Sequence, residues 1–330
     1  MTAIFFAAAL LLMPLLAGTA VLAWIGIRPR HDPLAYAGWA YLAGSVAIAL
    51  ALFVSVVVGP VLLIPFWILV VLKTIELIYV RRRGAAERGR RRDPSSDAAP
   101  ASIGRRGPFL ERLFFGVVVG ICLLVVGDRM IQADARAVIG QDEAHIWAAK
   151  AKVLYAAAGA GGELEELLAS ESIVYHKDYP LLNPLLQLGT FVLASDIVHV
   201  ANRVPIQGFF VALVLALAAA LRRVVRPAAA AVLLWLVVSA PISRMLISKA
   251  IADHLVALGL LVIMDAWWRY RQTGARCWWR LAVVALTFTA WSKNEGLVIA
   301  LLVASAVVLD DLASRFLGGR VVAPSPVAGE

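Results

Sequence analysis

Apolar runs long enough to cross a bilayer follow one another along almost the whole chain. They extend over about 17 to 25 residues, the helix length needed to cross a hydrocarbon core of roughly 30 Å. Of the 330 residues, 62% are hydrophobic and only 16% are charged, which is more apolar sequence than a soluble core of this size uses. Barrel strands are shorter than these runs. The sequence therefore predicts an all-α fold, a polytopic membrane helix bundle.

The apolar runs predict about nine transmembrane helices in two units separated by a basic segment. Residues 1–80 form an N-terminal three-helix unit, residues 81–112 a disordered basic linker, and residues 113–313 a larger membrane domain. A tail, 314–330, follows. The N-terminus lacks a basic stretch, so we expect a retained helix and no cleaved signal peptide. The predicted spans are 3–27, 34–58, 61–80, 113–131, 204–221, 228–247, 250–268, 279–292 and 296–313.

Positive charge in the loops predicts the orientation of the bundle. The formal net charge of +9 is concentrated between apolar runs, which indicates membrane topology and gives no reason to expect a nucleic-acid partner. Because positively charged loops stay in the cytoplasm, we expect the arginine-rich linker 81–112 and the tail to be cytoplasmic, and residues 132–178 to form the first large outer loop.

The stretch 179–195 is the ambiguous one, because it contains Pro180 and Pro184 as well as polar side chains. If it does not span, a group of later arginines falls on the cytoplasmic side together with the linker. We therefore predict an interfacial or re-entrant helix that packs against protein. The arginines concerned are Arg222, Arg223, Arg226, Arg269, Arg271, Arg276 and Arg280.

Paired carboxylates open an amphipathic helix in the outer loop. Asp142 and Glu143 begin it, and Asp142 shares a helical face with Lys150. A carboxylate held at the membrane surface could abstract a proton from a hydroxyl while a lysine steadies a phosphate. The alternative is that the two carboxylates only cap the helix. Both interpretations stay open at this stage.

Further ionisable side chains follow at the outer ends of later segments. They could bind substrate, or they could be interfacial anchors of the kind that lysine and tyrosine often form. No cofactor is required by these patterns, although a divalent metal could join Asp142, Glu143 and His145. Two cysteines, Cys122 and Cys277, are too few for a zinc site and badly placed for a bridge. The candidate binding residues are His176, Lys177, Tyr179, Arg244, Lys249, Asp253, Lys293 and Glu295.

Four short motifs occur in the same order as in a known enzyme family. The pattern resembles the C-type membrane glycosyltransferases, which use polyprenyl-phosphate sugars and include protein O-mannosyltransferase-like and aminoarabinose-transferase-like enzymes. The motifs are the Asp142-Glu143 pair, Trp147-x-x-Lys150-Ala151-Lys152 with His176-Lys177-Asp178-Tyr179-Pro180-Leu181-Leu182, Ala252-Asp253, and Ser292-Lys293-Asn294-Glu295-Gly296.

The resemblance implies a transferase in a bacterial inner membrane with its active face outward. It implies that Asp142 deprotonates the acceptor and that Lys177, Arg244 or Lys293 lies near the lipid phosphate. Its partners would be a polyprenyl-phosphate sugar donor, the bilayer and a further membrane protein. The alternative is a non-catalytic or truncated homologue that serves as an assembly subunit. A transporter is disfavoured, since the spans 113–131, 204–221 and 296–313 are almost wholly apolar until their ends and no internal repeat is evident in the sequence.

Overall fold

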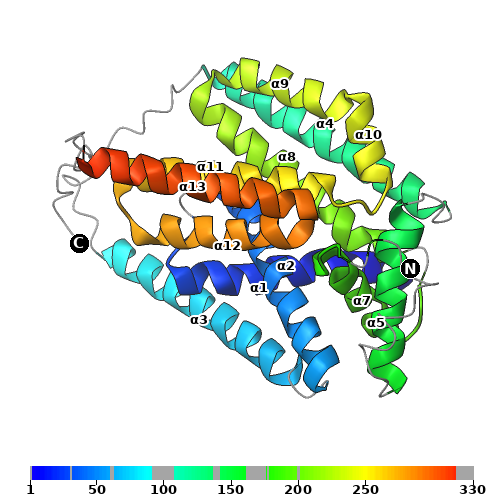
Figure 1. Cartoon of the computed structure of the whole chain (residues 1–330). Helices are drawn as coiled ribbons and strands as arrows, with labels where there is room; N and C mark the ends of the chain where they lie inside the picture. The colour runs from blue at the N-terminus through cyan, green and yellow to red at the C-terminus, as the bar shows by residue number, and fades with distance from the viewer. Residues whose placement is uncertain are drawn as a thin grey trace.

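The computed structural model describes residues 2–29, 32–59, 63–90, 108–136, 142–160, 176, 178–198 and 201–316, and every regular element within them is a helix (Figure 1). The N-terminal helices are α1 (Thr2–Ile25), α2 (Pro33–Val58), α3 (Leu63–Arg90) and α4 (Phe109–Asp134). A π-helix, η2 (Asp142–Ala148), leads into α5 (Ala149–Ala160), and α7 (Leu182–Ala194) and a 3-10 turn, η3 (Ala201–Arg203), follow. The remaining helices are α8 (Val204–Val224), α9 (Pro227–Ser239), α10 (Pro241–Ser248), α11 (Asp253–Thr273), α12 (Arg276–Ser292) and α13 (Asn294–Phe316).

Five of these helices are long and apolar enough to cross a membrane: α1, α2, α4, α8 and α13. The bent pair α9 and α10 makes a sixth candidate if it counts as one span. The prediction of a polytopic helix bundle is confirmed to this extent, whereas about nine spans are not found among the described residues. Three of the predicted spans are not among these candidates. Helix α12 has only 17 residues, and α11 carries Asp253, Asp265 and Arg269 along its length. Helix α3, which corresponds to the predicted span 61–80, is the third.

The predicted span 228–247 is broken in the middle. Helices α9 and α10 meet at an angle of 61° at Ala240-Pro241. Proline has no N–H to donate to the carbonyl four residues earlier, which here belongs to Val237. The Ser243 hydroxyl donates to that carbonyl instead, at 2.5 Å. The predicted span is therefore two helices, and the shorter one, α10, leads into the connection with α11.

Close helix packing builds the core. Helices α1 and α2 touch through glycines: a Cβ on Gly18 would lie 1.6 Å from the Ala40 carbonyl oxygen, and one on Gly44 would lie 1.8 Å from that of Pro14. Small residues of this kind let membrane helices approach closely. In Figure 1, α4, α9 and α10 cover one side of α8, while α1, α2, α11, α12 and α13 lie on the other.

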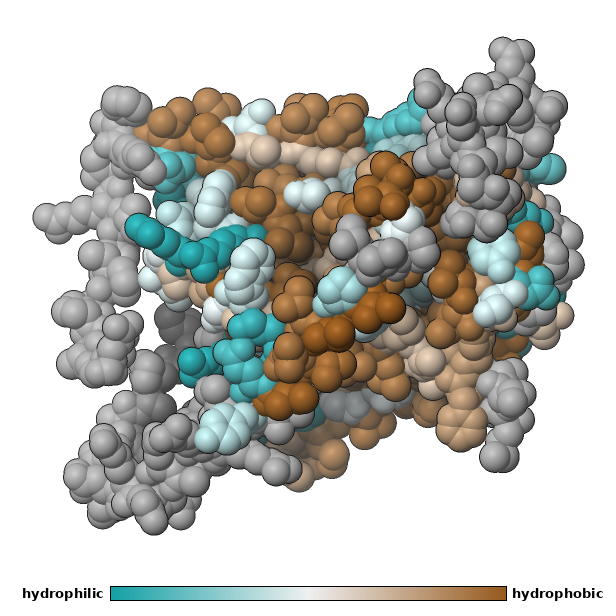
Figure 2. Space-filling view, turned by 90° about the horizontal axis from the view of Figure 1, so that it is seen from below, coloured by the Kyte–Doolittle hydropathy of each residue, from teal (hydrophilic) through white to brown (hydrophobic). Residues whose placement is uncertain are grey.

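Polar side chains gather at the two ends of the bundle. At one end, the arginine end, Arg223 pairs with both Asp32 and Asp265, and Arg269 pairs with Asp265 at 3.1 Å. The start of α2, the end of α8 and the end of α11 therefore share this end, as expected if the segment 179–195 does not cross. Figure 2 shows an apolar surface across the middle of the molecule with hydrophilic side chains toward its two ends.

Helix α7 explains how the ambiguous segment accommodates its prolines. Pro180 precedes the helix and Pro184 falls in its first turn, where a backbone N–H has no partner inside the helix. Asn183 and Gln187 are fully buried. The segment is thus a short helix enclosed by protein, packed against α2, α5 and α8.

The domain boundaries shift at the linker. Helix α3 continues to Arg90, so the first part of the predicted disordered linker 81–112 is helical. Residues 91–107 of that linker, residues 161–175 of the predicted outer loop and residues 317–330 of the tail lie outside the described residues.

Candidate active site

The two paired carboxylates stand at the start of the π-helix η2 and point to different surroundings. Asp142 is exposed, whereas Glu143 is only 1% exposed. A π-helix is rare and short and is frequent at functional sites. The structure therefore separates two residues that the sequence presents as one acidic motif.

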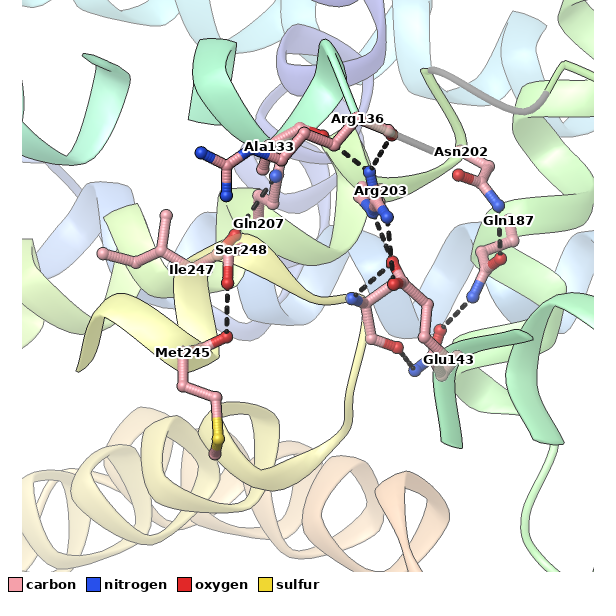
Figure 3. A network of polar contacts seen from close by, with 12 residues as sticks. Ala133, Arg136, Glu143, Gln187, Asn202, Arg203, Gln207, Met245, Ile247 and Ser248 are labelled. Atoms are coloured by element: carbon pink, nitrogen blue, oxygen red, sulfur yellow. Dashed lines mark hydrogen bonds and ion pairs between the residues drawn. The ribbon is translucent and has the colours of Figure 1, made fainter. Parts of the chain in front are cut away.

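Glu143 forms a buried ion pair with Arg203, the last residue of η3 (Figure 3). The Arg203 Nε donates to Glu143 Oε1, and its Nη2 donates to Oε2 at 3.0 Å. The Arg203 Nη1 also donates to the carbonyl oxygens of Ala133 and Arg136, at 2.6 and 2.8 Å. Bidentate pairing with satisfied donors is the geometry that makes burial of two charges tolerable. The pair ties η2 to the end of α4 and the start of α8.

The same carboxylate fixes the connection between α10 and α11. The Ala250 N–H donates to Glu143 Oε1 at 3.0 Å, and the Asn183 amide donates to the Ala250 carbonyl at 2.9 Å. Gln187 donates to Asn183 at 2.8 Å, and Asn202 donates to Gln187 at 3.0 Å. We call these five side chains, Glu143, Arg203, Asn183, Gln187 and Asn202, the buried network.

A second group of polar residues, exposed or half-buried, comes together from separate segments. The Lys293 Nζ lies 3.2 Å from Asp253 Oδ1 and 3.5 Å from Glu295 Oε1. The Asn294 amide donates to the Asp178 carboxylate. These residues come from the turn before α7, the start of α11 and the turn between α12 and α13. With Asp142 and Tyr179 they form what we call the rim cluster: Asp142, Asp178, Tyr179, Asp253, Lys293, Asn294 and Glu295.

Tyr179 stands among the charges of the rim cluster. Its ring centroid lies 5.5 Å from that of Trp147 and 4.9 Å from that of His176, with which it stacks. Burial raises the pKa of its hydroxyl, and the carboxylates of Glu295, Asp178 and Asp142 raise it further, while Lys293 opposes them. All four charged groups are thus within electrostatic reach of one ring.

Lys293 is the basic member of the rim cluster. Burial lowers the pKa of its ammonium, but Asp253 and Glu295 outweigh that effect, so the pKa is raised above its usual value. The group is held as a cation at neutral pH, which suits it to bind an anion.

Lys150 does not lie at the surface beside Asp142, where its helical spacing predicts it. Its side chain is 1% exposed, and its Nζ donates to the carbonyl oxygens of His176 and Tyr179, at 2.5 and 2.9 Å. Burial lowers its pKa to about 8, against the opposing charge of Asp178. Lys150 therefore holds the turn that carries Asp178 and Tyr179 and does not face the surface beside Asp142.

Other predicted residues fall outside the rim cluster. Arg244 is exposed on α10 and Lys249 is half-buried at its end, and neither makes an ion pair with another described residue. Lys177 lies outside the described residues. Within the described ranges no three His, Cys, Asp or Glu side chains come close enough to hold a metal, so Asp142, Glu143 and His145 do not form the ligand set considered above.

Arg203 is the central residue that the sequence patterns do not reveal. It immediately precedes an apolar run, a position where arginine usually faces the headgroups. Its neighbour Asn202 and the i, i+4 pair Asn183 and Gln187 are the only local signals of a buried polar cluster.

No family model, no curated protein and no solved structure matches this chain.

Proposed function

We propose that the rim cluster is the active site of a membrane glycosyltransferase that moves a sugar from a polyprenyl phosphate to an acceptor hydroxyl at the outer face of a bacterial inner membrane. The observation that carries the proposal is convergence. Asp142, Asp178, Asp253 and Lys293 come from four segments of the chain. The charges of Asp142, Asp178 and Lys293 all act on the pKa of Tyr179, Asp253 pairs with Lys293, and Asn294 donates to Asp178. The motif resemblance described above supplies the reaction class.

Asp142 is the acceptor base in this proposal. It is exposed, and within the described residues no ion pair occupies its carboxylate. The acceptor hydroxyl gives its proton to Asp142 while its oxygen forms a bond to the anomeric carbon. The bond between that carbon and the phosphate oxygen breaks, and the electron pair leaves with the polyprenyl phosphate. A single displacement inverts the anomeric centre and needs only one carboxylate, unlike the two-carboxylate hydrolases.

Lys293 is the donor-phosphate ligand. Its partner Glu295 is 59% exposed in its side chain, so an incoming phosphate oxygen can replace this carboxylate at the ammonium without opening the core. A cation fixed near the departing phosphate stabilises the negative charge that develops there. Asp253 stays beside Lys293 and keeps the ammonium oriented.

Glu143 and Lys150 act as positioning residues in this scheme. Glu143 fixes both η2, which carries Asp142, and the connection that leads to Asp253. Lys150 fixes the turn that carries Asp178 and Tyr179. Neither side chain reaches the surface where a substrate would bind. The described residues give a metal no ligand set, so we assign no step to one.

A second candidate function is a non-catalytic subunit that keeps the rim cluster as an ion-paired contact. The observation in its favour is that two carboxylates already flank Lys293. An enzyme and a subunit differ in one simple property, which is turnover.

The deciding experiment incubates the purified protein in detergent with a panel of polyprenyl-phosphate sugars and membrane-extracted acceptors. The glycosyltransferase proposal requires transfer by the unchanged protein and its loss in Asp142→Asn, with an unchanged thermal unfolding curve. Transfer that persists in Asp142→Asn contradicts the assignment of the base, and absence of transfer across the panel favours the subunit.

The proposed orientation has its own test. A single cysteine at position 274, in the turn after α11, should be shielded from an impermeant thiol reagent in intact cells, and one at position 165 should react. Labelling at 274 from outside would reverse the orientation.

A further inference from the structure

Helix α3 carries a pair of opposite charges on a surface that the other described residues leave open. The Lys73 Nζ lies 2.6 Å from Glu76 Oε2, and the two side chains are 44% and 59% exposed. In Figure 1, α3 diverges from the other helices, and it packs against the core through the buried Val70 and the partly buried Leu63, Phe66 and Trp67. The charges therefore face away from the bundle.

The pair lies near the middle of the apolar stretch of α3. Lys73 is ten residues after Leu63 and eight before Arg81, which places it about 15 Å and about 12 Å along the helix axis from these residues. Ionisable groups at such a depth are costly in hydrocarbon and normally face protein or water. The sequence predicts that 61–80 crosses the membrane, and an ion pair left open on one side of such a span indicates a missing neighbour.

The residues around the pair form a continuous helical face. Leu69, Leu72, Lys73 and Glu76 are spaced i, i+3, i+4 and i+7, so they lie on one side of α3. Leu69 and Leu72 are both more than half exposed. This face is apolar at one end and carries both signs of charge at the other.

We propose that this face of α3 packs against the same face of a second copy of the chain, and that Lys73 of each copy pairs with Glu76 of the other. Two copies in one membrane have the same orientation, so their α3 helices run parallel and a two-fold axis relates them. Residues three apart differ by about 60° around a helix and about 4.5 Å along it. Lys73 and Glu76 thus flank the middle of the face, and the two-fold axis sets each lysine opposite the other copy's glutamate.

The charge pattern selects a second copy as the occupant. A partner with a single charge would neutralise one member of the pair and repel the other. A face that bears one lysine and one glutamate symmetrically about its middle is complementary to itself. In the dimer the two ion pairs inside the helices, one in each copy, are exchanged for two ion pairs between the helices. Every charge stays compensated, and the lysines and glutamates are removed from lipid.

Cross-linking tests where the contact lies. In a background with Cys122 and Cys277 replaced by alanine, Leu69→Cys should form a disulfide-linked dimer in native membranes under mild oxidation. Ile75→Cys is the matched control, because Ile75 is 57% exposed but points to another side of α3. Equal cross-linking at the two positions, or none at Leu69, overturns the proposed face.

Charge exchange tests the occupant. Two differently tagged copies are co-expressed, one with Lys73→Glu and one with Glu76→Lys, so that one face is doubly negative and the other doubly positive. Each variant expressed alone should lose the Leu69 cross-link through like-charge repulsion, and the mixed pair should recover it and co-purify. If the mixed pair does no better than the single variants, or if Leu69→Cys cross-links only to a different protein, a second copy is not the partner.

Discussion

The buried network and the rim cluster start from adjacent residues, Glu143 and Asp142, and yet they follow opposite rules. In the buried network a desolvated carboxylate is matched by one fixed guanidinium and one backbone N–H. In the rim cluster the carboxylates outnumber the single lysine and remain open to water. The difference shows that two adjacent acidic residues of one π-helix can lie in opposite surroundings, one held in the interior and the other open to solvent.

Removal of Arg203 should have the largest effect on folding. Arg203→Met leaves Glu143 as an unpaired buried charge and should lower the free energy of unfolding by about 3 to 5 kcal/mol. Thermal and denaturant unfolding in detergent, followed by tryptophan fluorescence, measures the loss. The double variant Glu143→Gln/Arg203→Met should be less destabilised than the sum of its single changes.

Arg222 offers the matched control for that change. It lies at the arginine end, 3.6 Å from Asp32, and is 42% exposed, so Arg222→Met should cost no more than about 1 kcal/mol. Similar losses for Arg203 and Arg222 would remove the distinction between a buried and an open ion pair.

Asp142→Asn should have the largest effect on activity. The amide keeps the size of the side chain but cannot accept a proton, so transfer should fall by about 10²- to 10⁴-fold with no change in unfolding temperature. Sugar transfer from the polyprenyl donor measures the fall. Glu143→Gln is the adjacent comparison, and its activity should fall together with its stability. A folding defect in Asp142→Asn would assign this residue to helix capping.

Lys293→Met should produce a smaller loss. Without its ammonium the rim cluster is wholly acidic, so the apparent Michaelis constant for the donor should rise, or turnover fall, by about tenfold, equivalent to roughly 1.4 kcal/mol. Lys249→Met is the matched control, since Lys249 is a half-buried lysine at the same end that makes no ion pair with another described residue. Donor titrations that do not distinguish the two variants would exclude Lys293 as a phosphate ligand.

The smallest effect concerns pH. Burial lowers the pKa of Lys150 in the folded protein to about 8, below the value of about 10.4 typical of an unfolded chain. Between these values the unfolded state binds more protons, so the free energy of unfolding should increase as the pH rises. The gain from pH 7 to pH 9 should be on the order of 1 kcal/mol. Comparison with Lys150→Met isolates this contribution, and parallel pH profiles for the two proteins would contradict it.

Apolar periodicity and arginine placement predict much of the fold, because lipid permits few alternatives for a run of apolar residues. They predict the helical class and the grouping of Arg223 and Arg269 at one end. They do not predict the bend at Pro241 or the helical residues that extend α3 to Arg90. The bend and the extension of α3 both depend on local backbone geometry, which cannot be inferred from hydrophobicity.

The candidate site is predictable to a lesser extent. The ionisable residues of the short turns, Asp253, Lys293 and Glu295, are found together as expected from their shared end of the bundle. Neighbouring side chains already point about 100° apart on a helix, so which of Asp142 and Glu143 is buried depends on distant partners such as Arg203. The burial of Lys150 likewise depends on carbonyls from a distant turn. Neither can be inferred from spacing on an ideal α-helix.

The anchoring of Ala250 at both its N–H and its carbonyl has a consequence for how this chain can vary. Glu143 accepts a hydrogen bond from the N–H of Ala250, and Asn183 donates one to its carbonyl, in the connection between α10 and α11. An insertion or deletion in this connection would move Ala250 away from Glu143 and Asn183 at once. The Glu143 carboxylate would then have one hydrogen-bond donor fewer. We therefore expect related chains to differ freely in the amino acids of this connection but to keep its length, while insertions accumulate in the turns at the arginine end.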